Sequence, residues 1–203
     1  MWLGLFSATA ADIERLTNAD GLSNSSVTTI FQDSSHLMWF GTWDGLNRYN
    51  GHEFKVFKPS PDYNSIGNNI IRDIVECDGD IWIATDRGID RYDSDKKSFS
   101  HYFTEMLSSA AVREHTFHII NGLEKTVYAG INGKGIYSYS PEDDEFDLIE
   151  GLAGIEFVTF FIDSHGRIWY LTSDNELVMT FSDTVISNVM NVFIEGNLLW
   201  IQT

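Results

Sequence analysis

Apolar and polar residues follow one another along this chain in short runs, and this pattern predicts β-strands. Segments rich in apolar and β-branched residues recur, namely SVTTIFQD, NIIRDIVE, TFHIING and FVTFFID. Each is followed by a shorter apolar run such as MWFGT or IWIAT, bounded by turn residues. Continuous runs of this length are typical of strands buried on both faces. No stretch of eleven or more residues has a convincing 3.6-residue apolar period with caps, so few helices are expected.

One stretch, MWFGTWDGLNRYNG at residues 38–51, returns several times along the chain. Its copies include GDIWIATDRGIDRYDSDKKSF, KTVYAGINGKGIYSYSPEDDEF, GRIWYLTSDNELVMTF and a final GNLLWIQT. The repeated aromatic is Trp39, Trp82, Tyr128, Trp169 and Trp200, at intervals of 43, 46, 41 and 31 residues. Periods in the low forties are typical of propeller blades, each of about four strands.

The repeated residue types have structural explanations. The large aromatic is expected to fill the wedge between adjacent blades, where inner strands are buried on both faces. Gly45, Gly88 and Gly135 close the turn after the second strand, where a residue without a side chain can take a positive φ. Arg48 and Arg91 are expected near the rim, along apolar surface, with the guanidinium on a carboxylate or carbonyl. We therefore interpret the repeated stretch as part of the structural scaffold, with no catalytic role of its own.

These features predict an all-β chain that forms an incomplete β-propeller, about four and a half four-stranded antiparallel blades from a ring of seven. Within residues 12–203, the blades are expected at 24–57, 68–103, 115–149 and 156–182, with a fifth beginning at 187–203. Residues 12–17 align with an inter-blade stretch and are interpreted as an orphan fourth strand that closes the ring. Residues 1–11, MWLGLFSATAA, are interpreted as a signal-peptide remnant, with a frayed N-terminus as the alternative.

Composition excludes several classes of function. Thirteen basic against thirty acidic residues give a formal charge of −17, which repels phosphate backbones, so we expect no nucleic-acid binding. Cys77 is the only cysteine, which rules out an internal disulfide and a thiolate-rich metal site. His115 and His118 are three apart in an expected strand, where they point to opposite faces and chelate poorly. No metal or cofactor is expected, and no catalytic motif indicates an enzyme.

The first two copies, DGLSNSSVTTIFQDSSHLMWFGTWDGLNRYNGHEF and NSIGNNIIRDIVECDGDIWIATDRGIDRYDSDKKSF, resemble the two-component regulator propeller repeat. The later copies resemble it more loosely, with His36, Tyr128 and Glu176 departing from its usual glycine, tryptophan and glycine. This repeat builds the extracytoplasmic sensor of hybrid two-component histidine kinases of Bacteroides-type bacteria. The resemblance implies a periplasmic location, further blades and a kinase in the same chain, a homodimer at full length, and an oligosaccharide ligand that controls glycan-utilisation genes.

One face of the expected propeller carries the turns after the second strands and the links after the fourth strands. The copies differ most there, and the groups they present suit sugars, because aromatic rings stack on apolar sugar faces. The candidate ligand-binding residues are Trp43, Asp44, Asp86, Arg87, Asn132, Lys134, Asp174 and Asn175. The alternative is that they are solvated turn residues. Other functions left open are a propeller-type carbohydrate-active enzyme (a lyase or sialidase relative), a protein-interaction scaffold, and a sensor for another output domain.

Overall fold

The computed structural model describes residues 15–104, 117–195 and 198–203, and these form β-strands with two single turns of 3-10 helix. The first two antiparallel sheets follow chain order: β1 (Val27–Gln32), β2 (Met38–Thr42), β3 (Gly45–Tyr49) and β4 (Phe54–Phe57), then β5 (Ile71–Cys77), β6 (Asp80–Thr85), β7 (Gly88–Asp93) and β8 (Ser98–Tyr102). The third and fourth sheets repeat this order: β9 (Phe117–Asn121), β10 (Val127–Ile131), β11 (Gly135–Ser140) and β12 (Glu145–Ala153), then β13 (Thr159–Ile162), β14 (Ile168–Leu171), β15 (Leu177–Met179) and β16 (Val185–Ile186). A two-stranded sheet, β17 (Asn191–Glu195) and β18 (Leu198–Gln202), follows.

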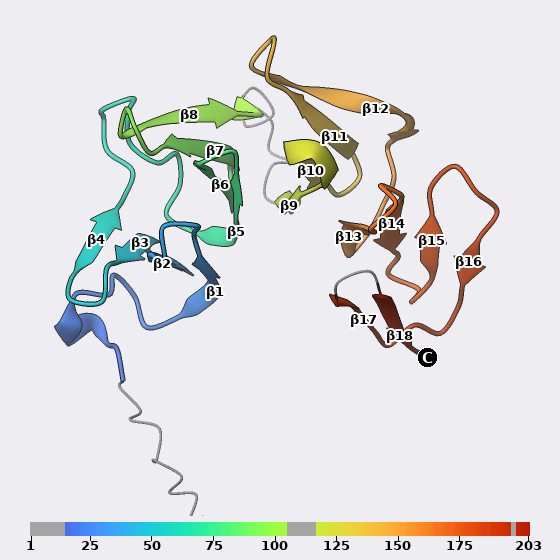
Figure 1. The fold of residues 1–203 in the computed structure, drawn as a ribbon, viewed down its shortest axis with the longest axis horizontal. Helices are drawn as coiled ribbons and strands as arrows, with labels where there is room; N and C mark the ends of the chain where they lie inside the picture. The colour runs from blue at the N-terminus through green and yellow to red at the C-terminus, as the bar shows by residue number, and fades with distance from the viewer. Residues whose placement is uncertain (1–14, 105–116, 196–197) are drawn as a thin grey trace, which may run out of the picture.

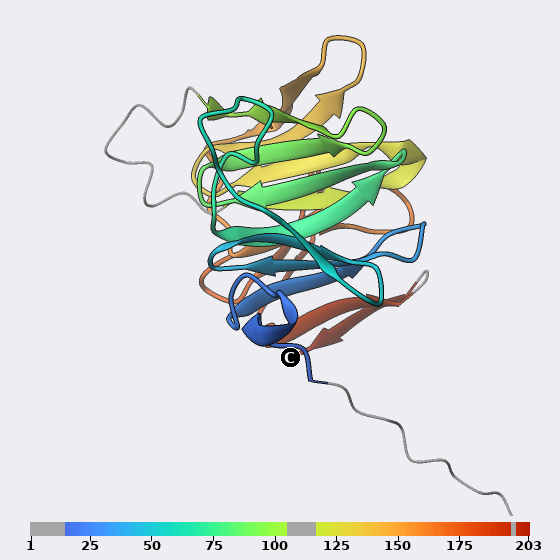
Figure 2. The ribbon, with the colours of Figure 1, turned by 90° about the vertical axis from the view of Figure 1, so that its left-hand side faces the viewer.

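The sheets are arranged as a fan around a shared axis (Figure 1). The first strand of each sheet lies nearest the centre of the fan, and the fourth strand lies at its periphery. Seen from the side, successive sheets stack face to face (Figure 2). This confirms the predicted all-β propeller of four-stranded antiparallel sheets, while a ring of seven blades stays a prediction.

The hydrophobic core lies at the boundaries between sheets. Trp39 of the first sheet is 1% exposed and belongs to a cluster with Ile71 and Tyr92 of the second. Trp169 of the fourth sheet likewise packs in a cluster with Val192 of the fifth. Trp200, at the equivalent position of β18, is 47% exposed. The repeated aromatic therefore fastens its own sheet to the next one along the chain.

A buried carboxylate holds the indole N–H in two of these wedges. Trp39 Nε1 donates to Asp33 Oδ2 at 2.8 Å, and Trp169 Nε1 donates to Asp163 Oδ2 at 2.9 Å. Both aspartates also accept backbone N–H groups of the turn between the first and second strands. A single carboxylate thus fixes both the turn and the core tryptophan.

The glycine that opens the third strand in the first three sheets is required by a close approach of backbone. Gly88 has φ of 134°, and a Cβ added there would lie 2.6 Å from the carbonyl oxygen of Tyr102 on the fourth strand. Gly45 has φ of 123°, and its added Cβ would lie 2.9 Å from the carbonyl oxygen of Phe57. In the fourth sheet, Glu176 stands where the repeat has glycine, and the outer strand has only two residues.

The limits of the predicted units differ from the structure in places. The fourth sheet is completed by β16, which lies after the expected end of that unit at residue 182. Arg15, Leu16 and Thr17 belong to no strand, and residues 12–14 of the expected closing strand lie outside the described residues, as do residues 1–11. Among the described residues, no helix has the length and apolar character needed to cross a membrane.

Candidate ligand-binding site

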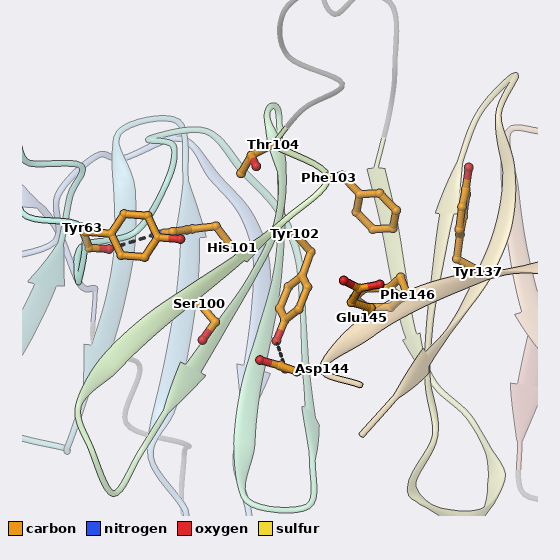
Figure 3. Close-up of a pocket in the computed structure, with 10 residues that line it drawn as sticks. All are labelled: Tyr63, Ser100, His101, Tyr102, Phe103, Thr104, Tyr137, Asp144, Glu145 and Phe146. Atoms are coloured by element: carbon orange, nitrogen blue, oxygen red, sulfur yellow. Dashed lines mark hydrogen bonds between the residues drawn. The ribbon is translucent and has the colours of Figure 1, made fainter. Parts of the chain in front are cut away.

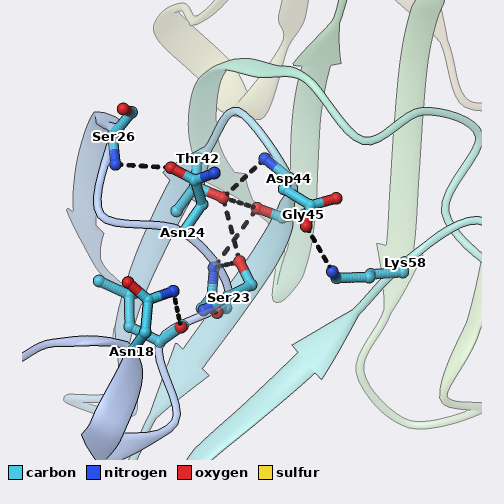
Figure 4. A network of polar contacts seen from close by, with 10 residues as sticks. Asn18, Ser23, Asn24, Ser26, Thr42, Asp44, Gly45 and Lys58 are labelled. Atoms are coloured by element: carbon cyan, nitrogen blue, oxygen red, sulfur yellow. Dashed lines mark hydrogen bonds and ion pairs between the residues drawn. The ribbon is translucent and has the colours of Figure 1, made fainter.

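The ligand is expected to bind at the turns that follow the second strands. Side-chain contacts connect the first two of these turns. The indole of Trp43 is 54% exposed, and the guanidinium of Arg72 lies 5.5 Å from its ring centroid. Arg72 also forms an ion pair with Asp86 in the turn of the second sheet. Asp44 pairs with Lys58 of the next link at 2.6 Å (Figure 4). Trp43 and Asp86 therefore belong to one polar and aromatic surface, in which Arg72 is the residue between them.

The remaining predicted residues are distributed over the later sheets. Asn132 uses its side-chain oxygen to accept the backbone N–H of Phe157 at 2.8 Å, which ties its turn to the link before the fourth sheet. The side chains of the others are exposed: Arg87, Lys134, Asp174 and Asn175. The described contacts join the first two turns, and a ligand-binding role for all eight predicted residues stays a prediction.

Sequence reasoning missed a pair of buried polar residues on the third strands. Asn47 and Asp90 occupy the position before the arginine of NRY and DRY and are 0% and 3% exposed. Asn47 Oδ1 accepts the backbone N–H of Ser23 at 2.8 Å, and Asp90 Oδ2 accepts that of Gly67 at 2.8 Å. Each side chain anchors the link that leads into its own sheet. Both residues stand directly before the arginine of the repeated motif, and this shared position is the feature of the sequence that identifies them.

Asp90 also holds His101, its cross-strand partner on β8. The Nδ1 atom of His101 lies 2.7 Å from Asp90 Oδ1, and the Nε2 atom lies 3.0 Å from the carbonyl oxygen of Tyr63. Because a carbonyl and an ionised carboxylate only accept, both contacts are hydrogen bonds when the imidazole carries both protons. The bond to Asp90 is the main cause that raises the pKa of His101, against the opposing effect of burial. This pair fastens the link that carries Tyr63.

A cleft of about 580 Å³ lies beside this pair, between the outer strand of the second sheet and the third sheet (Figure 3). Aromatic side chains from both sheets line it: Tyr102, Phe103, Tyr137 and Phe146. Its acidic residues, Asp144 and Glu145, come from the turn that precedes β12 and from that strand's first residue. Aromatic walls with a few polar groups are the usual composition of small-molecule sites.

Arg91 does not line this cleft but contacts two residues that do, Tyr102 and Asp144. Its guanidinium lies 5.4 Å from the ring centroid of Trp82, and Nη1 lies 3.1 Å from Asp144 Oδ1. The same carboxylate oxygen accepts the hydroxyls of Tyr102 and Tyr139 at 2.7 and 2.6 Å. Burial raises the pKa of Asp144, but the bonds from the two tyrosines and Arg91 outweigh it and lower the pKa. The carboxylate therefore stays ionised and orients the Tyr102 ring.

A polar residue also occupies the same register on every innermost strand, opposite the second residue after the repeated aromatic. These residues are Thr29, Asp73, His118, Thr159 and Asn191. Burial raises the pKa of Asp73 to about 6, and a hydrogen bond from its neighbour's N–H opposes this only in part. Burial lowers the pKa of His118. Within the described part of the chain, no three His, Cys, Asp or Glu residues are grouped to hold a metal; His115 lies outside it.

Comparisons with known proteins bear on this arrangement. The family model described as two component regulator propeller matches residues 21–44. A segment of 46 residues, 23% of this chain, is 50% identical to the histidine kinase P4 of Formosa agariphila, and covers 3% of that protein. Residues 21–44 therefore carry one two-component regulator propeller repeat. The expected resemblance is thereby confirmed for the first copy of the repeat.

The chain also matches solved structures in fold. The extracellular domain of a putative hybrid two component system from B. thetaiotaomicron matches with a TM-score of 0.63 at 19% identity, over 87% of this chain and 28% of that one. A second such domain matches with a TM-score of 0.52 at 22% identity, over 94% and 34%. Virginiamycin B lyase from Staphylococcus aureus matches with a TM-score of 0.59 at 14% identity, over 87% and 63%. At these identities the likeness shows the propeller fold alone, and the chain spans only a small part of the kinase and of the extracellular domains.

Proposed function

We propose that this regulator propeller is a ligand-sensing part of the extracytoplasmic region of a hybrid two-component histidine kinase. The observations that support it best are a 46-residue segment that is 50% identical to a histidine kinase and the match of residues 21–44 to the regulator propeller model. The fold shared with extracellular domains of two such systems agrees with it. In this proposal the propeller lies in the periplasm, the kinase acts as a homodimer, and the segment itself catalyses nothing.

The proposed ligand is an oligosaccharide whose binding changes the transcription of glycan-utilisation genes. The exposed indole of Trp43, beside the Arg72–Asp86 ion pair, supports this class of ligand. A sugar presents apolar C–H faces to an aromatic ring and hydroxyl groups to charged side chains, so this combination suits it. The turn residues Asp44, Arg87, Asn132, Lys134, Asp174 and Asn175 are proposed to extend this surface.

The test has two parts. First, the polypeptide that contains this chain is examined for a histidine kinase, and its autophosphorylation is measured with and without a panel of oligosaccharides. Second, Trp43→Ala is compared with Phe181→Ala, which removes another exposed aromatic, 74% exposed, from the fourth sheet. We expect one glycan to change autophosphorylation, with weaker binding in Trp43→Ala only. Absence of a kinase from that polypeptide would refute the sensor role, and a kinase that responds to no glycan would refute the ligand class.

A further inference from the structure

The aromatic cleft between the second and third sheets lies apart from the turn surface around Trp43. It is built from the fourth strand of one sheet and the third and fourth strands of the next, whereas Trp43 lies in a turn after a second strand. None of the eight ligand-binding residues that the sequence predicts lines it. Its volume of about 580 Å³ is within the range of roughly 300–1,000 Å³ that is usual for ligand pockets.

The walls of the cleft are held in place before any ligand binds. Phe103 contacts Tyr137 and Phe146, with ring centroids 5.1 Å apart in both pairs. The hydroxyl of Tyr102 is fixed by Asp144 (Figure 3). Phe103 has φ of 65°, a conformation that a bulky side chain rarely adopts and that neighbouring structure must enforce. Strained residues of this kind are concentrated at functional sites.

The polar groups of the cleft define the chemistry it can accommodate. Asp144 is already paired with Arg91 and accepts hydrogen bonds from two tyrosine hydroxyls. Glu145 carries the remaining carboxylate of the lining (Figure 3). A carboxylate accepts hydroxyl hydrogens well but repels an anionic ligand.

We propose that this cleft is a second binding site for the sensed glycan and that it takes a neutral oligosaccharide, not a sulfated or uronic one. The rings of Tyr102, Phe103 and Tyr137 would contact the apolar faces of a sugar unit. Glu145 would accept its hydroxyl groups. This inference rests on the proposed function, because it takes the oligosaccharide as the class of ligand and adds its charge and its place.

Tyr63 forms the outer wall of the cleft, and the His101–Asp90 pair determines where it stands. Its ring is 76% exposed and meets the His101 ring edge-on at 5.1 Å, while its carbonyl accepts from His101 Nε2. Among the described residues, the titratable groups that face this imidazole are Asp90 from β7 and Tyr63 from the link. Loss of the second imidazole proton releases one of the two bonds, so affinity for the oligosaccharide is expected to fall as the pH rises.

The experiment measures binding of short neutral oligosaccharides of glucose, mannose, galactose and xylose, and of oligogalacturonate, by titration calorimetry. The variants are Tyr63→Ala, which keeps the backbone carbonyl, and the isosteric Glu145→Gln. Their matched controls are Phe181→Ala and Glu142→Gln, which change an exposed aromatic and an exposed acid that do not line the cleft. We expect each cleft variant to bind a neutral glycan about fivefold more weakly, with controls within about twofold of the wild type.

Three results would overturn the inference, and they are distinguishable. If Trp43→Ala loses binding while both cleft variants bind as the wild type does, the cleft is not a site and the proposed function stands. If oligogalacturonate binds more tightly than every neutral glycan, the inferred charge of the ligand is wrong while the oligosaccharide class holds. Failure of every glycan to bind would overturn both the cleft and the ligand class of the proposed function.

Discussion

The carboxylate of Asp163 is expected to contribute a measurable, pH-dependent part of the stability. It is 6% exposed and accepts Trp169 Nε1 at 2.9 Å, Arg167 Nε at 2.6 Å, and the backbone N–H groups of His165 and Arg167. Burial raises the pKa of Asp163, but these bonds outweigh it and lower the pKa from 3.8 to about 2. At about 1.4 kcal/mol for each pKa unit, this difference corresponds to about 2 kcal/mol.

The sign of the effect follows from the lowered pKa. The contribution is complete above the pKa of the unfolded chain, near 3.8, and is lost as the pH falls through the folded value of about 2. Replacing Asp163 with Asn keeps the shape but removes the charge. We therefore expect Asp163→Asn to lower the free energy of unfolding by about 2 kcal/mol near neutral pH, and by progressively less below about pH 4.

Urea unfolding, followed by tryptophan fluorescence over a series of pH values, measures this difference. Other carboxylates titrate in the same range, so the quantity to follow is the gap between wild type and variant. Asp183→Asn, which changes an exposed carboxylate in the turn before β16, is the matched control and should leave the gap near zero. A gap for Asp163→Asn that stays constant down to about pH 2, or that is absent near neutral pH, would refute the linkage argument.

Three further outcomes are expected. Burial raises the pKa of Asp73 to about 6, so the charge on its carboxylate costs stability as the pH rises from 3.8 through that value. Calorimetry should therefore find that Asp73→Asn raises the melting temperature at about pH 8 and has little effect at about pH 4. Gly88→Ala should destabilise more than Gly51→Ala in chemical unfolding, because both have positive φ but only the first added Cβ would meet a backbone carbonyl within 3 Å; equal losses would contradict this. The bond to Asp90 raises the pKa of His101, so the stability this pair provides is complete below 6.5 and lost as the pH rises through the folded value; NMR titration should find a lower pKa in Asp90→Asn.

The fold was predictable from the sequence because its signals are local and repeated. Each of the first two copies brings its own buried strand around a tryptophan and its own turn glycine, so Trp39 and Trp82 align without any knowledge of the tertiary structure. The positive φ of Gly88 was likewise predictable from its turn. The carbonyl of the fourth strand that excludes a side chain there was not, because it depends on the register between β7 and β8.

The candidate site was less predictable because its contacts join residues that no local pattern relates. Trp43 was named from its turn, but Arg72 was not, since it lies in the next sheet beside a register shift of β5. The cleft is a stronger example. Tyr102 and Tyr137 are in different copies of the repeat, and they reach one cavity only because the outer strand of one sheet faces the third strand of the next.

The location of the core between sheets means that a single sheet has no interior of its own. Ile71 and Tyr92 are buried by Trp39, which the preceding sheet supplies. The stability of such an array comes from the interfaces between neighbouring sheets. Adding or deleting one repeat therefore changes the number of these interfaces without creating a new kind of interface. A ligand that tightens the packing between the second and third sheets would change the position of every sheet that follows. Binding at one place would then be transmitted along the stack of sheets.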